Sequence, residues 1–567
     1  MAHLGQINLQ WSISLIQALI DQGITRFVIS PGSRSTPLAL AVARNPLAQH
    51  QVIIDERSAA FFALGQSRQQ RSPSVLICTS GSAVANWLPA VVEANHAAVP
   101  LLLLSADRPA ELHQRGANQT IEQEQLFGVQ VRGHHSLSPP DEEQDPTAAL
   151  TTLLQEMMVQ LRQPVPGPVH INIPFREPLL PETFDSIDWS PAPIQFLPQR
   201  TLSRRWLLLN EAAEKIHQHP GIILCGEGHY PDTFYNPLNQ LAERLDCPIM
   251  VDPLSNLRWG HAPSARILTH YDATLRNSSS QPPSPQWVIQ FGDFPLSKTV
   301  ANWLTQNTIP TYFTIQYQRL WSDPESLATE VFHCSPEQFV NALLKQLSEP
   351  AQLPEWNHHF TTLEQQAHRW VSPYPLCTQQ LLHTLLNQLP EESVLFSANS
   401  MMIRDIDGWL PADKKSLTLH ANRGASGIDG NLSTACGVRS VVEAEVPVVA
   451  LLGDLTLFHD LNALSLVQQL EGEFTIIVVN NGGGGIFSYL PPAELPEFEP
   501  LWLTPPEIDF KQAAKLYQIE YYRIDEPLDL QQQLAHPLQK RGAKLIEWVV
   551  DREATITAHQ QYWESLQ

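Results

Sequence analysis

The chain has 567 residues, of which 43% are hydrophobic and 16% charged, and its formal net charge at pH 7 is −23. This is ordinary globular usage, so a chain of this length should fold into roughly three to four domains of about 150 residues each. The strong negative charge argues against a general nucleic-acid-binding surface, because binding to phosphates needs basic patches.

The same sequence gives no sign of a membrane or secreted protein. Its most apolar run, from Ala97 to Ala106, is far shorter than the ~20 residues that span a bilayer, and the start, MAHLGQINLQW, lacks a signal-peptide pattern. The six cysteines form no C-x-x-C pair, so neither a zinc site nor a disulfide framework is indicated. We therefore expect a cytoplasmic protein with no transmembrane segment and no nucleic-acid partner.

Residues 1–180 alternate helix and strand patterns, which predicts a doubly wound parallel sheet. A helix pattern over Leu9–Asp21 precedes a strand over Arg26–Ser30. A second strand, Val52–Ile54, ends in Asp55-Glu56-Arg57. Such sheets bind ligands beyond the carboxyl ends of their strands, so the residues that follow each strand are candidates for a site.

Two breaks divide the rest of the chain. The stretch PFREPLLPETFDSIDWSPAPIQFLPQR, residues 174–200, is rich in proline and predicts a linker, which we place at 181–204. A second α/β block follows at 205–350, and a third fills 356–567. The predicted fold class is therefore α/β, with three doubly wound parallel-sheet domains.

The third block contains a β-α-β unit between Val446 and Leu490. Two apolar runs, Val448–Leu452 and Phe474–Val479, predict parallel strands, and Asp460–Leu470 has mostly helical spacing. The first strand leads into Gly453-Asp454 and the second into Asn480-Asn481, so Asp454 and Asn481 should lie at one sheet edge. Such residues also commonly close strands as turns. Their placement one crossover apart favours a divalent-cation site, since Mg²⁺ takes a few oxygen ligands plus phosphate and water.

This pattern resembles the cofactor motif of the thiamin diphosphate-dependent enzymes. The resemblance implies that Asp454, Asn481 and the carbonyl of Gly483 hold Mg²⁺ (or Mn²⁺) against the cofactor's two phosphates. Gly453 and Leu455 would also contact the cofactor, although Leu455 stands where the family usually has Gly. Gly482 and Gly485 stand where larger polar residues would be expected.

The resemblance also implies a catalytic glutamate in the first domain. Glu56 stands at the matching strand end, where its carboxyl would stabilise the imino tautomer of the cofactor's aminopyrimidine. Considered alone, an acidic residue at a strand end is more often a solvated surface group. In this family the glutamate and the diphosphate site belong to different subunits, which implies a homodimer or homotetramer with active sites between subunits.

Five further stretches resemble one family of these enzymes, the 2-succinyl-5-enolpyruvyl-6-hydroxy-3-cyclohexene-1-carboxylate synthases (the MenD family). That resemblance implies a transferase of menaquinone or phylloquinone biosynthesis, which decarboxylates 2-oxoglutarate and adds the succinyl unit to isochorismate. The stretches are SPGSRSTP (30–37), DERS (55–58), SADRP (105–109), GANQ (116–119) and NRGASGIDG (422–430).

The residue types suit substrates that carry two carboxylates each, because Arg forks bind carboxylates with paired hydrogen bonds. Each Arg considered alone is more often part of a surface ion pair, and the case rests on the loops that these residues share with the other motifs. Ile428 would be the apolar wedge that holds the cofactor bent, and Ile486, Phe487 and Leu490 would pack over it. By matching position, the substrate-binding candidates are Ser33, Arg34, Arg108, Asn118, Gln119, Lys298, Ser400, Arg404 and Arg423.

Two alternatives remain open at this point. One is another 2-oxoacid decarboxylase or a carboligase of the acetolactate synthase type, against which the Arg set argues, because pyruvate brings a single carboxylate. The other is a non-catalytic ligand-binding protein that keeps the fold. The joint presence of Glu56, Asp454 and Asn481 argues against the second.

Overall fold

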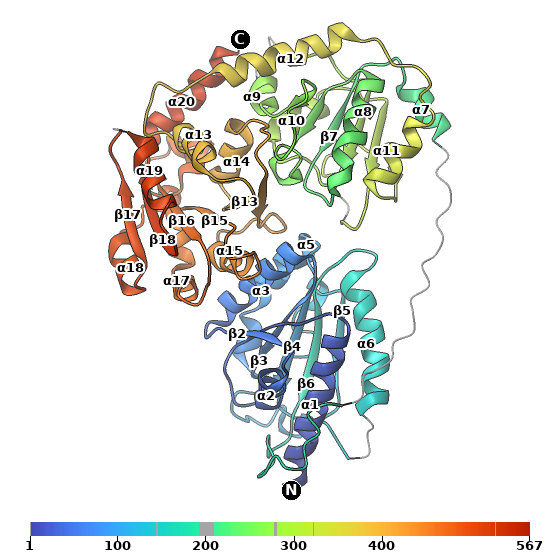
Figure 1. The fold of residues 1–567 in the computed structure, drawn as a ribbon, viewed down its shortest axis with the longest axis vertical. Coiled ribbons are helices and arrows are strands. Elements are labelled where there is room, and N and C mark those ends of the chain that lie inside the picture. Colours follow the sequence, from blue (N-terminus) through green and yellow to red (C-terminus); the bar gives the residue numbers. More distant parts are fainter. Residues whose placement is uncertain are drawn as a thin grey trace. The chain divides into compact units, whose positions relative to one another are not determined.

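The computed structural model describes residues 2–142, 146–191, 209–276, 281–320, 322–527 and 529–566. Over these residues it contains three sheets, each of six parallel strands, with helices packed around them (Figure 1). The predicted fold class is confirmed. Residues 192–204 of the predicted linker lie outside the described residues. In this described part of the chain, no helix combines the length and apolarity needed to cross a membrane.

The first sheet has the strand order β2-β1-β3-β4-β6-β5. Its central strands are buried along their whole length, as expected for a parallel sheet covered on both faces. One face packs on α1, α2 and α6, and α3 lies against the strands of the other. The strands are β1 (Arg26–Ile29), β2 (Gln49–Val52), β3 (Ser74–Cys78), β4 (Leu101–Asp107), β5 (Gly133–Ser136) and β6 (Val169–Pro174), and the helices are α1 (Ala2–Asp21), α2 (Thr36–Arg44), α3 (Glu56–Gln70), α4 (Ser82–Ala85), α5 (Leu88–His96) and α6 (Pro146–Arg162).

The second sheet has the order β12-β11-β10-β7-β8-β9. Alternate residues of its strands feed two separate hydrophobic cores, so both of its faces are covered. Its strands are β7 (Gly221–Cys225), β8 (Ile249–Val251), β9 (Ile267–Leu268), β10 (Trp287–Phe291), β11 (Thr311–Ile315) and β12 (Glu330–Phe332), with helices α7 (Asn210–Ile216), α8 (Tyr235–Leu245), α9 (Tyr271–Arg276), α10 (Lys298–Thr305) and α11 (Pro336–Leu344).

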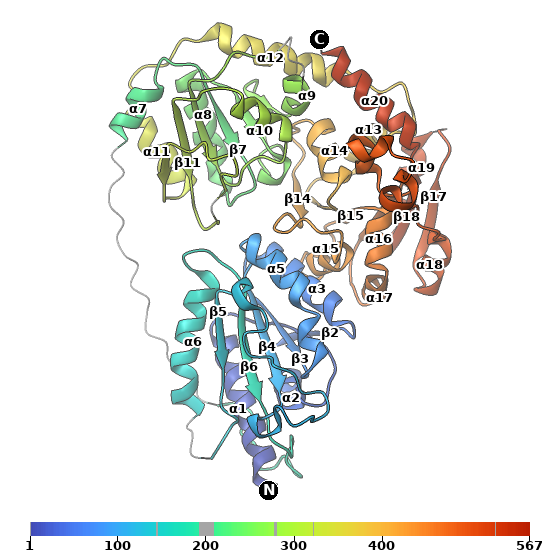
Figure 2. The same ribbon diagram turned by 180° about the vertical axis from the view of Figure 1, so that it is seen from behind.

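The third sheet has the order β14-β13-β15-β16-β18-β17. The long helix α12 (Pro354–Arg369) joins the second and third sheets, because Trp356 and Phe360 pack in a core of the second sheet while Ala367 packs in that of the third (Figure 2). The strands are β13 (Ser393–Ser397), β14 (Leu417–Ala421), β15 (Val448–Gly453), β16 (Phe474–Asn480), β17 (Glu520–Ile524) and β18 (Ala543–Val549), and the other helices are α13 (Thr378–Gln388), α14 (Met401–Trp409), α15 (Asn431–Arg439), α16 (Asp454–His459), α17 (Leu464–Val467), α18 (Phe510–Leu516), α19 (Leu530–Leu538) and α20 (Arg552–Ser565).

Contacts divide the chain into two compact units. The first comprises Met1–Leu202, Asn422–Glu443 and His459–Glu471, and the second comprises Ser203–Ala421, Ala444–Phe458 and Gly472–Gln567. Helix α15 therefore belongs with the first sheet, where it packs on α3. A Cβ atom added at Gly65 of α3 would lie 2.0 Å from the Thr434 carbonyl oxygen, and one added at Gly437 of α15 would lie 2.0 Å from that of Phe62. Glycine on both helices permits this close approach.

Three predicted elements differ from the structure by more than one residue. Helix α1 begins at Ala2, well before the predicted start at Leu9. Strand β2 ends at Val52, so the predicted strand over Val52–Ile54 was placed too late along the chain. The predicted helix over Asp460–Leu470 is broken into a 3₁₀ turn (Leu461–Ala463) and the short helix α17, while α16 starts directly at Asp454. Asp460, at the break, lies outside helical geometry, and its buried carboxylate accepts hydrogen bonds from Ser433 on α15.

Candidate active site

The carboxyl edge of the third sheet places Asp454 directly after β15, and β15 pairs with β16 up to Gly453 and Val479. Asp454 is 1% exposed. Its Oδ2 accepts a hydrogen bond from the Gly483 amide (2.8 Å), and its Oδ1 accepts one from the Leu455 amide (2.6 Å). Burial raises the pKa of Asp454 to about 6, against the opposing effect of these backbone donors.

Asn481 stands beside this carboxylate, just beyond β16. Its side-chain Oδ1 is buried and accepts no hydrogen bond from the described residues. A buried oxygen without a donor is costly, and a bound cation would satisfy it. The described residues contain no cluster of three or more His, Cys, Asp or Glu side chains that could hold a metal. A cation here would therefore rely on one carboxylate, amide and backbone oxygens, and ligand phosphate, a donor set that fits Mg²⁺.

Close packing explains why glycines follow Asn481 in the sequence. Gly483 has φ +123°, and a Cβ there would lie 2.1 Å from the Leu503 carbonyl oxygen. A Cβ at Gly485 would lie 2.6 Å from the Asn481 side-chain nitrogen. Gly485 thus leaves room for Asn481, which explains why no larger residue stands there.

Glu56 occupies the first position of α3, at the carboxyl edge of the first sheet. The preceding Asp55 caps the helix, its side chain accepting a hydrogen bond from the Ser58 amide (3.1 Å). Burial raises the pKa of the Cys78 thiol, and the Glu56 carboxylate raises it further. Glu56 therefore lies near the end of β3 and is itself only half-buried.

Two predicted arginines meet at one carboxylate in the first unit. Arg34 is buried, and its guanidinium donates to the Phe175 carbonyl (2.8 Å) and pairs with Glu177 (2.7 Å). An Arg108 nitrogen lies 3.8 Å from the same Glu177 oxygen. Burial and the nearby Arg108 cation lower the pKa of Arg34. The two guanidinium groups share one exposed carboxylate, so a substrate carboxylate could compete with Glu177 for them.

The uncharged substrate-binding candidates of the first unit lie near the carboxyl edge of the first sheet. Gln119, held at φ +57°, donates from its side chain to the Ser80 carbonyl oxygen (2.8 Å) at the end of β3. Ser33 and Asn118 are exposed. The side chains of Ser33 and Asn118 are therefore accessible to a ligand, whereas the Gln119 side-chain nitrogen already has a partner.

The loop that carries Arg423 and Ile428 rests on a buried acid that the sequence did not single out. Glu93 of α5 is 2% exposed and accepts hydrogen bonds from the amides of Gly424 (2.8 Å) and Ala425 (2.6 Å). Ile428 is 37% exposed, which leaves it accessible to a ligand. No sequence motif surrounds Glu93, so its role is visible only from its hydrogen bonds to this loop in the structure.

A cavity of about 480 Å³ in the second unit brings four predicted residues together. It lies among α9, α10, α14, α20 and the 3₁₀ turn Gly485–Tyr489, and its lining includes Lys298, Arg404, Ile486 and Leu490. Ser400 accepts a hydrogen bond from Arg404 through its carbonyl oxygen, at the start of α14. The lining also includes Asp405, Tyr489 and His559, which sequence reasoning missed.

Phe487, in contrast to its neighbours Ile486 and Leu490, packs against the chain itself. A Cβ added at Gly484 would lie 2.9 Å from the Phe487 ring. Phe487 is therefore placed to support the glycine run rather than to line this cavity.

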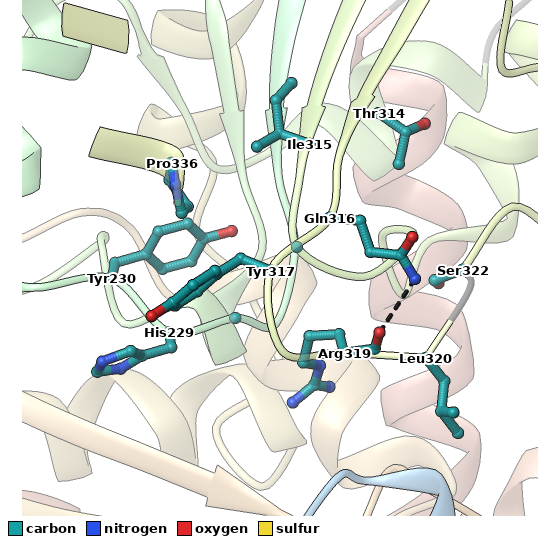
Figure 3. Close-up of a pocket in the computed structure, with 12 residues that line it drawn as sticks. His229, Tyr230, Thr314, Ile315, Gln316, Tyr317, Arg319, Leu320, Ser322 and Pro336 are labelled. Atoms are coloured by element: carbon teal, nitrogen blue, oxygen red, sulfur yellow. Dashed lines mark hydrogen bonds between the residues drawn. The ribbon is translucent and has the colours of Figure 1, made fainter. Parts of the chain in front are cut away.

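The middle sheet has a much smaller hollow at its carboxyl edge, beyond β7, β10 and β11 (Figure 3). Its volume is about 10 Å³, the room of roughly one water molecule. Arg319 fills the space beside it and pairs with Asp293 and Glu227, while the Gln316 side chain donates to the Arg319 carbonyl oxygen (3.0 Å). The chain's own side chains thus occupy the place where such sheets commonly bind nucleotides.

Three family models match the chain in order. The thiamine pyrophosphate enzyme N-terminal TPP binding domain matches residues 11–126, the middle domain of thiamine pyrophosphate enzymes matches 187–397, and the C-terminal TPP binding domain matches 410–548. The N- and C-terminal matches cover the loops that carry Glu56, Asp454 and Asn481.

Curated relatives match over nearly the whole chain. The 2-succinyl-5-enolpyruvyl-6-hydroxy-3-cyclohexene-1-carboxylate synthase of Dechloromonas aromatica is 39% identical, over 96% of this chain and 99% of its own length. The enzymes of the same name from Bacillus pumilus and Listeria innocua are 35% and 34% identical, over 97% and 99% of this chain and 96% and 98% of their own lengths.

Among solved structures, an X-ray structure from Mycobacterium smegmatis that carries the name of a thiamin diphosphate-dependent enzyme has a TM-score of 0.69 at 16% identity. The match covers 96% of this chain and 99% of that one. At this identity the likeness shows a shared fold.

Proposed function

Because the chain belongs to the family of 2-succinyl-5-enolpyruvyl-6-hydroxy-3-cyclohexene-1-carboxylate synthases, within the thiamin diphosphate-dependent enzymes, we propose that it decarboxylates 2-oxoglutarate and transfers the succinyl unit to isochorismate by conjugate addition. This reaction belongs to menaquinone or phylloquinone biosynthesis. The observation that supports the cofactor assignment best is the buried Asn481 oxygen without a donor beside buried Asp454.

The third-domain residues would hold the diphosphate end of the cofactor. Asp454, the Asn481 amide oxygen and the Gly483 carbonyl would bind Mg²⁺ (or Mn²⁺), which would neutralise the charge of the cofactor's diphosphate. Gly453 and Leu455 flank Asp454 in the chain, and the Leu455 amide helps to fix the carboxylate. When bound, thiamin diphosphate supplies the nucleophilic carbon and the electron sink for decarboxylation.

Residues of the first compact unit would control the position of a proton on the cofactor and bind the charged groups of the substrate. The Glu56 carboxyl would hydrogen-bond the aminopyrimidine ring and fix its tautomer, and Ile428 would support the bent cofactor. Arg34 and Arg108 would bind substrate carboxylates. The substrate would either replace Glu177 as their ion-pair partner or bind beside it.

The remaining candidates divide between the two units. Lys298 and Arg404 would bind anionic substrate in the 480 Å³ cavity, with Ile486 and Leu490 as its apolar side. Ser33, Asn118, Gln119, Ser400 and Arg423 would complete the set, and Phe487 would support the glycine loop. We also propose a homodimer or homotetramer, in which a site is completed by residues of two subunits.

A coupled assay tests the activity directly. With 2-oxoglutarate, isochorismate, thiamin diphosphate and Mg²⁺, the isochorismate absorbance should decrease, and omission of any one component should prevent that decrease. Replacement of 2-oxoglutarate by pyruvate should leave at most a few per cent of the rate. Equal turnover of pyruvate, with or without isochorismate, would favour a carboligase of the acetolactate synthase type instead.

A further inference from the structure

Three side chains beside Arg404 form a row of close polar contacts that no sequence motif predicts. The Tyr489 hydroxyl lies 2.9 Å from Nδ1 of His559, and Nε2 of the same imidazole lies 3.1 Å from Oδ1 of Asp405. The three come from different elements: the 3₁₀ turn after the glycine run, α20 and α14. The row therefore depends on tertiary packing, and we call it the tyrosine row (Tyr489, His559 and Asp405).

Packing allows the tyrosine row little freedom. Asp405 is 3% exposed and His559 is 7% exposed. The Tyr489 ring meets the imidazole edge-on, at 90° and 5.5 Å between centroids, and the Trp409 ring centroid lies 5.0 Å from that of the imidazole. A buried carboxylate is costly unless it is paired, so the imidazole is held to Asp405. The Tyr489 hydroxyl in turn contacts Nδ1 of the imidazole, which also lies 3.0 Å from the Thr555 carbonyl oxygen of its own helix.

The tyrosine row opens on the cavity that contains Lys298 and Arg404. All three of its members line that cavity, together with Ile486 and Leu490. Lys298 is exposed at the start of α10, so the cavity combines cations with an apolar wall. A phenol whose hydroxyl already has one fixed partner still has hydrogen-bonding capacity for a ligand. Fixed polar groups of this kind give a largely apolar site its selectivity.

We propose that Tyr489 is a further substrate-contacting residue, whose hydroxyl hydrogen-bonds an oxygen of the acceptor held by Lys298 and Arg404. His559 and Asp405 are positioning residues that act through Tyr489. The inference rests on the proposed function, because it takes the acceptor to be isochorismate, a ring that carries carboxylates and a hydroxyl. Rejection of an analogue that lacks a recognised oxygen is the expected property of such a site.

The first experiment compares two tyrosine variants. Tyr489→Phe keeps the ring and removes only the hydroxyl, so the KM for isochorismate should rise roughly 3- to 10-fold, the value of one net hydrogen bond. The KM for 2-oxoglutarate should change less than two-fold. The matched control is Tyr522→Phe, whose hydroxyl bonds Glu520 on β17 and which should leave both constants unchanged.

The second experiment separates positioning from general stability. His559→Gln and Asp405→Asn should each raise the KM for isochorismate in the wild-type background. In the Tyr489→Phe background the same substitutions should change it less than two-fold, because their effect passes through the hydroxyl. A purely structural role would lower the melting temperature and change both KM values together.

The outcomes distinguish this inference from the proposed function. If wild-type protein fails to consume isochorismate with 2-oxoglutarate, the proposed function is wrong. If the wild type is active and Tyr489→Phe retains its KM for isochorismate, the assignment of Tyr489 is wrong. Equal effects of His559→Gln with and without the Tyr489 hydroxyl would overturn the positioning role.

Discussion

The first and third sheets share one strand order, since β2-β1-β3-β4-β6-β5 and β14-β13-β15-β16-β18-β17 are the same arrangement counted from each domain's first strand. Their carboxyl edges nevertheless carry different chemistry. In the first sheet the acid Glu56 follows the second strand, whereas in the third sheet Asp454 follows the third strand. The shared topology provides an edge, and the residue that begins each following helix decides what that edge can bind.

Burial also separates the two acids. Glu56 is half-buried, while Asp454 is 1% exposed and receives two backbone hydrogen bonds. A partly exposed carboxyl suits exchange of a proton with a ligand, whereas a buried carboxylate with fixed donors suits a cation. The comparison therefore predicts that a substitution at Glu56 lowers turnover, whereas a substitution at the cation site lowers the affinity for the cofactor.

The largest loss should come from Glu56→Gln. The amide keeps the size of the side chain but cannot act as the acid, so kcat should fall roughly 10²- to 10⁴-fold. Binding of thiamin diphosphate, followed by ligand-induced thermal stabilisation, should persist. Glu182→Gln, at an exposed position, is the control and should retain full activity. Near-normal turnover by Glu56→Gln would contradict the catalytic role of Glu56, and with it the proposed difference between the two sheet edges.

Loss of the cation site is expected to be the next largest effect. Asn481→Leu preserves volume but removes the oxygen that has no donor, and the apparent affinity for thiamin diphosphate with Mg²⁺ should fall roughly 10- to 100-fold. Titration of the cofactor at fixed Mg²⁺ measures this affinity, and excess Mg²⁺ should restore part of it. Asn210→Leu, on the exposed start of α7, should titrate like the wild type. An unchanged affinity in Asn481→Leu would place the cation elsewhere.

The sequence predicted the two edges because their signal is local. A strand, a glycine and an acid occur within a few residues around Asp454, and the Asn481 pair repeats that pattern one crossover later. The family motifs extended this prediction to Arg34, Arg108 and Arg423, which lie within contiguous motif stretches. These features can be inferred from the sequence because the β-α-β unit fixes where the ends of its strands lie.

Other parts of the site depend on pairs that are distant in sequence. Glu93 supports the Gly424 amide across 331 positions, and Tyr489 meets His559 across 70. No spacing rule connects such residues. The need for glycine at position 485 was equally hidden, because it comes from the position of the Asn481 amide rather than from any turn.

The two second-strand helices, α3 and α15, extend the comparison to stability. Gly437→Ala would place a methyl group 2.0 Å from the Phe62 carbonyl oxygen, and we expect a loss of about 1–3 kcal/mol in the free energy of unfolding. Gly408→Ala in α14 is the matched control, because a Cβ there meets nothing within 4 Å. That variant should gain about 0.5–1 kcal/mol from helix propensity. Urea unfolding measures the free energy of unfolding of both variants. Equal changes in the two would show that α3 and α15 can move apart to accommodate the added methyl group without a loss of stability.

The caps of the same two helices differ as well, and the difference should appear as a pH dependence. Helix α3 is capped by the adjacent Asp55, whereas α15 receives the fully buried Asp460, whose carboxylate accepts from the Ser433 amide (2.8 Å). Burial raises the pKa of Asp460 to about 7, opposed by its hydrogen bonds to Ser433. In the unfolded chain the group titrates at about 3.9.

Between these two pH values the folded chain holds one proton more than the unfolded chain, so its stability falls as pH rises from about 4 to 7 and then levels off. Asp460→Asn mimics the protonated acid, because its oxygen can accept from the Ser433 amide while its nitrogen donates to the hydroxyl. From pH 5 to pH 8 this variant should lose about 2.5 kcal/mol less than the wild type, because about two pH units of that window lie below the folded pKa, at about 1.4 kcal/mol each. The exposed cap variant Asp509→Asn should follow the wild-type curve. A parallel decline in Asp460→Asn would assign the pH dependence to other groups.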